Sequence, residues 1–160
     1  MPTADVDRRV ETFLGALRAR GLKVTHQRTE VFRELARSDE HPDAETLYRR
    51  VRAGIPAISR DTVYRTLDWL VSQGLARKVD ALHERARFDA NLDRHHHFVC
   101  TACGAVRDFT SPGLDALHVP RAVRAWGNVD VVQVQVRGTC RRCQAGRKRK
   151  AKRRGASRPR

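Results

Sequence analysis

The sequence has 160 residues, of which 33 are lysine or arginine and 18 are aspartate or glutamate, so its formal net charge is +15 at pH 7. This length allows one or two small domains, and the longest apolar run is far shorter than the ~20 residues of a membrane-spanning helix. We therefore expect a soluble, cytoplasmic protein with neither a signal peptide nor a membrane partner.

The first half of the sequence has helical periodicity. Apolar residues from Val6 to Leu17 recur on one face and predict a first helix that ends near Gly21. Three further helices are predicted. The second begins after Thr25, the third begins at Pro42 and Asp43 and ends at Gly54, and the fourth begins after Ser59 and ends at Gly74. Two short strands near residues 76–79 and 86–88 follow. Packed helices that lead into a β-hairpin predict a winged helix-turn-helix.

Beyond about Asp93 the pattern changes to that of strands. Strands are predicted at residues 96–100, 105–109 and 130–139, the last from valines that alternate with glutamines. A helix is expected between the second and third strands, and Pro120 either starts or breaks it. The chain is therefore predicted to be a two-domain α/β protein, in which the winged helix precedes a small α/β domain.

The four cysteines form two C-x-x-C pairs, Cys100 with Cys103 and Cys140 with Cys143. A C-x-x-C turn directs two thiolates at one point, and two such turns complete the four ligands of a tetrahedral zinc site. Disulfides are the alternative, but the chain is long enough to form a core without them. The cysteines therefore predict a structural Zn(2+) site.

Histidines and aspartates suggest a second metal site. In a strand, His95 and His97 project to one face and His96 to the other, and Asp89, Asp108 and His41 occupy positions near predicted element ends or strands. Mixed imidazole and carboxylate ligation suits Fe(2+) or Mn(2+) better than a soft metal. A chance surface tract of histidines is the alternative.

The fourth helix is a candidate for DNA recognition. Arg60, Thr62, Tyr64 and Arg65 lie opposite or beside its apolar stripe, and arginine is the commonest side chain that recognises guanine. An ordinary solvated helix face is the alternative. Residues 141–160 contain eleven Lys or Arg and no acid, which favours either a solubilising tail or attraction to a polyanion such as nucleic acid.

Several stretches of the sequence form a recognisable set: GLKVTHQR, HPDAETLY, SRDTVYRTLDWLVSQGL, RFD, HHHFVCTACG and GTCRRC. Together they resemble the ferric uptake regulator superfamily, and most of all its peroxide-sensing branch. The resemblance implies a homodimeric, metal-dependent transcriptional repressor that binds a double-stranded DNA operator. It implies a winged helix at residues 1–88, a hinge at 89–93 and an α/β dimerisation domain at 94–144; a basic disordered tail at 145–160 lies outside it.

By position, the resemblance assigns residue roles. It implies structural zinc at Cys100, Cys103, Cys140 and Cys143, and regulatory Fe(2+) or Mn(2+) at His41, Asp89, His95, His97 and Asp108. Tyr64 and Arg65 match the DNA-contacting pair. Aspartate at both carboxylate positions favours the peroxide sensors, since iron-uptake regulators tend to carry glutamate. The last strand lacks the histidines and glutamate of a further metal site, so none is expected.

The chain is therefore predicted to be a metal-activated repressor, with neither enzyme activity nor a small-molecule substrate. An iron-, manganese-, zinc- or nickel-responsive regulator of the same family is the nearest alternative. A non-haem iron oxygenase and a basic zinc-ribbon protein that binds nucleic acid are remote ones. Metal-dependent binding to one specific operator distinguishes the repressor from both remote alternatives.

Overall fold

The structure is a computed structural model that describes residues 3–79, 86–129 and 131–147. The chain divides into two compact units, Met1–Asp93 and Arg94–Arg160. Among the described residues, no helix combines the length and the apolar character that crossing a membrane requires.

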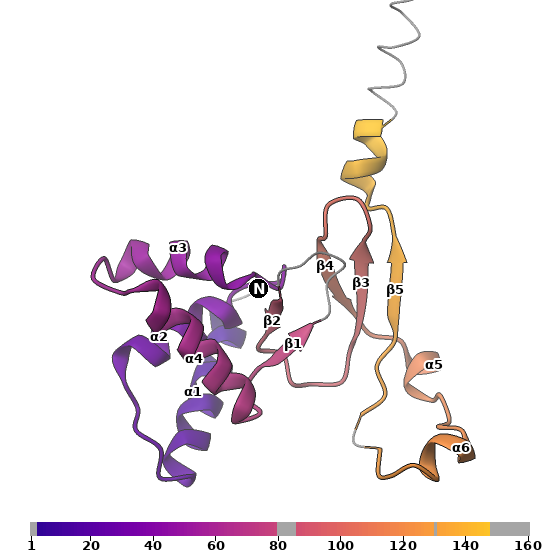
Figure 1. Cartoon of the computed structure of the whole chain (residues 1–160), viewed down its shortest axis with the longest axis horizontal. Coiled ribbons are helices and arrows are strands. Elements are labelled where there is room, and N and C mark those ends of the chain that lie inside the picture. Colours follow the sequence, from indigo (N-terminus) through magenta and orange to yellow (C-terminus); the bar gives the residue numbers. More distant parts are fainter. Residues whose placement is uncertain (1–2, 80–85, 130, 148–160) are drawn as a thin grey trace, which may run out of the picture. The chain divides into compact units, whose positions relative to one another are not determined.

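Helices followed by a hairpin make up the described part of the N-terminal unit (Figure 1). The elements are α1 Thr3–Ala19, α2 His26–Ala36, α3 Ala44–Gly54, α4 Arg60–Ser72, β1 Arg77–Val79 and β2 Arg87–Asp89. The predicted caps form, since the side chains of Thr25, Asp43 and Ser59 each accept a hydrogen bond from the backbone N–H three residues later. Residues 80–85, which connect the two strands in the sequence, lie outside the described residues.

One hydrophobic core joins the helices to the hairpin. The Phe13 ring of α1 stacks on Phe32 of α2 with centroids 4.2 Å apart, and the buried face of α4 supplies Val63, Leu67 and Leu70. Strands β1 and β2 pair antiparallel, with Arg77 opposite Asp89, and Phe88 of β2 belongs to the same core. The core therefore holds α4, with its opposite face exposed, beside the hairpin, as in a winged helix-turn-helix.

The C-terminal unit contains a three-stranded sheet in the order β4-β3-β5. Strand β3 (His96–Cys100) pairs antiparallel with β4 (Val106–Phe109) and parallel with β5 (Gln135–Gly138). The prediction of a strand over residues 130–139 was too long. Pairing between β3 and β5 begins with His97 opposite Gln135, and at this point the Val134 carbonyl accepts a hydrogen bond from the His97 N–H at 3.1 Å. The strand therefore starts at Gln135, although the apolar alternation begins earlier.

Two short helices, α5 Pro112–Asp115 and α6 Arg121–Arg124, replace the single predicted helix. Pro120 stands at the N-cap of α6 and therefore starts it rather than breaking it. Residues 141–147 are also helical, so the first three residues of the segment expected to be disordered, 145–147, are ordered in this helix. The rest of that segment, residues 148–160, lies outside the described residues.

Candidate metal centres

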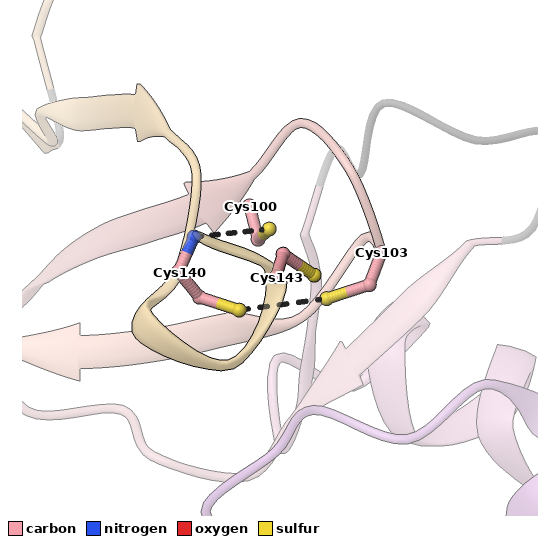
Figure 2. Close-up of side chains that lie close together, drawn as sticks. All are labelled: Cys100, Cys103, Cys140 and Cys143. Carbon is pink, nitrogen blue, oxygen red and sulfur yellow. Dashed lines mark hydrogen bonds between the residues drawn. The ribbon is translucent and has the colours of Figure 1, made fainter. Parts of the chain in front are cut away.

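The four cysteines come together at one end of the small sheet (Figure 2). Cys100 ends β3, and the chain then turns sharply: the N–H of Gly104 donates to the Cys100 carbonyl at 2.9 Å, with Gly104 in the left-handed region at φ +68°. Cys140 follows β5, and the Gln144 N–H donates to the Cys140 carbonyl at 2.9 Å. Because β3 and β5 are parallel neighbours, both turns follow strand ends that lie at the same end of the sheet.

The sulfur atoms have the spacing of ligands around one ion. All four lie within 4.8 Å of one another, and the Cys103 and Cys140 sulfurs are 3.9 Å apart. A disulfide bond measures ~2.05 Å, whereas thiolates at ~2.3 Å from a tetrahedral zinc ion lie roughly 3.8 Å from each other. All four cysteines are free, and the cluster fits structural zinc.

The thiols in this cluster differ in acidity. The backbone N–H of Cys140 donates to the Cys100 sulfur at 3.3 Å and lowers the pKa of Cys100 to about 6. Hydrogen bonding with the Cys140 and Cys103 thiols raises the pKa of Cys143 to about 12. Cys143 therefore keeps its proton until a bound cation offsets the negative charge of the neighbouring cysteine sulfurs. Metal binding at this cluster should release protons and weaken as the pH falls.

A second group of ligand atoms lies on one face of the same sheet. The Nε2 atoms of His95 and His97 are 3.0 Å apart, and Asp108 Oδ1 lies 3.7 Å from the first and 3.4 Å from the second. The register causes this convergence, because His97 lies directly opposite Asp108 in the antiparallel pair of β3 and β4. Two imidazole nitrogens and a carboxylate oxygen form a three-atom face suited to Fe(2+) or Mn(2+).

The N-terminal unit has a ligand pair of its own. His41 precedes α3, Asp89 ends β2, and His41 Nε2 lies 3.5 Å from Asp89 Oδ2. Both side chains are buried. The other carboxylate oxygen of Asp89, Oδ1, accepts a hydrogen bond from the N–H of Asn91 at 2.7 Å, which orients Oδ2 toward the imidazole.

His96 faces away from the His95 and His97 imidazoles, as its alternation with them predicts. Its Nδ1 accepts a hydrogen bond from the Val134 N–H at 3.2 Å, and its Nε2 lies 3.4 Å from Asp115 Oδ1. Arg94 Nε lies 3.1 Å from the same oxygen. Neither Asp115 nor Arg94 belongs to a motif that the sequence displays. The feature that identifies them is the burial of His96, the middle residue of the triplet. That burial is known only once the fold is known.

The exposed face of α4 carries most of the predicted DNA-binding side chains. Arg60, Tyr64 and Arg65 are exposed, and Tyr64 is 46% accessible. Thr62 is half-buried, and its hydroxyl lies 2.8 Å from the capping hydroxyl of Ser59. Beside this face the Arg28 guanidinium lies 4.3 Å from the centroid of the Trp69 ring. The surface is cationic and partly aromatic, which suits contact with DNA.

The family model described as "Ferric uptake regulator family" matches residues 19–137, a span that includes α4, the hairpin and both groups of histidines. The chain belongs to the ferric uptake regulator family. It is therefore a metal-responsive regulator, and the prediction of this family is confirmed.

Individual relatives cover most of the chain. The peroxide-responsive repressor PerR of Staphylococcus aureus (strain Mu50 / ATCC 700699) is 29% identical over 141 residues, which are 87% of this chain and 94% of the relative. The crystal structure of the Campylobacter jejuni peroxide stress regulator is 31% identical with a TM-score of 0.66, covering 81% of this chain and 98% of that one. A zinc-bound manganese uptake regulator is 29% identical with a TM-score of 0.64, covering 82% and 98%.

These comparisons confirm the predicted fold, a helical DNA-binding region followed by a small sheet domain. They also confirm the general function, a dimeric DNA-binding repressor that uses metal. The cysteine cluster fits structural zinc, and the histidine and aspartate groups fit a regulatory metal. The role of each individual ligand and of each DNA-binding residue stays a prediction.

Proposed function

We propose that the protein is a peroxide-responsive repressor whose regulatory metal is held jointly by His41, Asp89, His95, His97 and Asp108. The observation that carries this proposal is the make-up of the two ligand groups. Each group holds imidazole and carboxylate atoms within 4 Å of each other and contains no thiol. Neither group completes a six-coordinate sphere by itself, whereas five ligands from both suit Fe(2+) or Mn(2+) and leave one position for peroxide.

The proposed site couples metal binding to DNA binding. Residues 89–93 act as the hinge between the winged helix and the dimerisation domain, and shared ligands from both sides fix the angle at this hinge. In a dimer, that angle sets the separation of the two α4 helices, which must match half-sites about one DNA turn, ~34 Å, apart. Metal and operator then favour the same conformation, so each raises the affinity for the other.

Peroxide removes this coupling by altering a ligand. Fe(2+) held by these residues would supply the electrons that split the O–O bond of hydrogen peroxide, and it would regain them as the ligand ring is oxidised. A ring C–H of His41 or His95 then becomes C–OH, and the second peroxide oxygen leaves as water. The modified ring loses its ligand geometry, the hinge is released and the repressor leaves its operator. The peroxide responses of the Staphylococcus and Campylobacter relatives support this proposal, and the manganese uptake regulator supports a metal-uptake response as the alternative.

The protein acts by binding rather than as an enzyme, because its chemistry consumes its own ligand. We place it in the cytoplasm, where its operator is accessible and where reducing conditions keep the zinc-binding thiols from forming disulfides.

Asp89→Asn tests the metal site. The amide keeps an oxygen for the Asn91 N–H but lacks the charge that attracts the cation. Loss of a ligand should weaken metal binding more than loss of a group that only orients a ligand, which costs ~10–100-fold. Half-maximal operator binding should therefore need more than about tenfold more Mn(2+). Fluorescence anisotropy of a labelled operator would measure it. Asp93→Asn, an exposed position in the same segment, is the matched control, and an equal effect of both changes would contradict the assignment.

Arg65→Ala separates base recognition from general attraction to DNA. Losing a base contact should cost about 1–3 kcal/mol at the operator and blur base preference. Deleting residues 148–160 should weaken binding to all DNA alike and flatten its salt dependence, because those charges only release counterions. Binding to operator and random DNA over a range of salt concentrations would distinguish them. Loss of site selection on tail deletion, with Arg65→Ala unaffected, would show that α4 is not the recognition helix.

A further inference from the structure

The backbone at His41 has an unfavourable conformation. Its φ is +49°, and it is the one residue other than glycine with a positive φ in the described part of the chain. This left-handed region costs free energy for any residue with a Cβ atom. The following residue, Pro42, disfavours the right-handed helical alternative for His41. Other contacts must therefore hold His41 in this conformation.

Strand β2 supplies these contacts. Arg87 Nη1 donates to the His41 carbonyl at 3.0 Å and lies 3.5 Å from the Glu40 carbonyl. The N–H of Phe88 donates to the Pro42 carbonyl at 3.1 Å. The backbone is thus held on both sides of the peptide bond that follows His41.

The same strand carries the other ligand of the N-terminal unit. Arg87 and Asp89 are two positions apart in β2, so their side chains leave the same face of the strand. The Arg87 guanidinium holds the His41 carbonyl while the Asp89 carboxylate lies 3.5 Å from the His41 imidazole. The distance between the two ligands therefore depends on one short strand segment that contacts His41 through both side chains.

We propose that Arg87 is a positioning residue of the regulatory metal site: its guanidinium holds the strained His41 backbone so that the imidazole meets Asp89 before metal arrives. This inference rests on the function proposed above. Arg87 touches neither the metal nor peroxide. Its effect is on affinity, because without it part of the free energy of metal binding must restore the left-handed conformation.

The test measures Mn(2+) affinity in the full-length, zinc-loaded protein from the electron paramagnetic resonance signal of free Mn(2+). Arg87→Ala and Arg87→Gln should each weaken binding about 10–100-fold, the usual cost of losing a group that orients a metal ligand. Arg87→Lys, which can donate to one carbonyl, should recover part of the affinity. All variants should keep their zinc, because the cysteines lie in the other unit.

Arg20→Ala is the matched control. Arg20 Nη1 also donates to a distant backbone carbonyl, that of Gln73 at 2.5 Å, but far from His41 in the sequence and on other elements. It should lose a similar amount of thermal stability and bind Mn(2+) as the wild type does. If Arg87→Ala does not fold, the Mn(2+) affinity of Arg87→Gln is compared with that of Arg20→Ala instead.

Wild-type affinity in the folded Arg87 variants would overturn the role of Arg87, and so would an equal loss in Arg20→Ala. If the zinc-loaded wild-type protein bound no Mn(2+) at all, that result would instead contradict the proposed function itself.

Discussion

Cys140→Ser is expected to give a protein that holds no zinc and whose C-terminal unit does not fold. Among the residues described in that unit, the buried apolar side chains are Val99, Cys100 and Val106, whereas the large core belongs to the N-terminal helices. A sheet with so little core needs another source of stability. Structural zinc contributes ~10 kcal/mol or more in isolated zinc modules, so losing one of four ligands removes the largest single contribution to this unit.

Zinc content and urea unfolding of Cys140→Ser, beside Thr139→Ser, would measure the effect. Thr139 is the neighbouring residue, and its carbonyl accepts a hydrogen bond from the Gln144 side chain, so its conservative replacement leaves all four sulfurs in place. We expect Thr139→Ser to hold one zinc per chain as a dimer and Cys140→Ser to be monomeric or aggregated. A folded wild-type protein with two disulfides and no zinc would show that the cysteines have a different role.

Local signals in the sequence predicted the helical unit well. The caps at Thr25, Asp43 and Ser59 depend only on a side chain and the backbone three residues later, so sequence spacing determines them. The last strand depended on a partner instead. Its alternating valines fit a long strand, but the register with β3 begins at His97 opposite Gln135, and β5 starts there. An apolar pattern shows which face is buried, and the neighbouring strand determines where pairing starts.

The candidate site divides in the same way. The cysteine spacing and the i, i+2 histidines are short-range patterns, and the structure brings their ligand atoms together within the C-terminal unit. Arg87 could not be found from the sequence, since it donates to a backbone carbonyl 46 residues away, and every residue type has such a carbonyl. The joint binding of one ion by both ligand groups stays a prediction, which metal and peroxide experiments test.

The chemistry at the regulatory metal distinguishes a peroxide sensor from a metal-uptake regulator. Both interpretations of this chain share the family fold, dimeric DNA binding and the cysteine cluster. Only the sensor requires a ligand histidine to be consumed. The chain contains histidines that serve as internal controls. His96 lies one residue from two proposed ligands but faces Asp115, and His26 and His118 are exposed.

The iron-loaded protein, given a small excess of hydrogen peroxide, is expected to gain one oxygen atom on His41 or His95 and to release its operator completely. The Mn(2+)-loaded protein should stay bound and unmodified, because Mn(2+) does not readily reduce peroxide. Peptide mass spectrometry before and after peroxide, beside operator binding, would measure both effects. Oxygen on His26 or His118 as well would indicate unselective oxidation in solution. Unmodified histidines, with operator release governed only by removal of iron, would contradict peroxide sensing. That result would favour control by metal supply, because the five ligands would then act only by whether their site holds a metal ion.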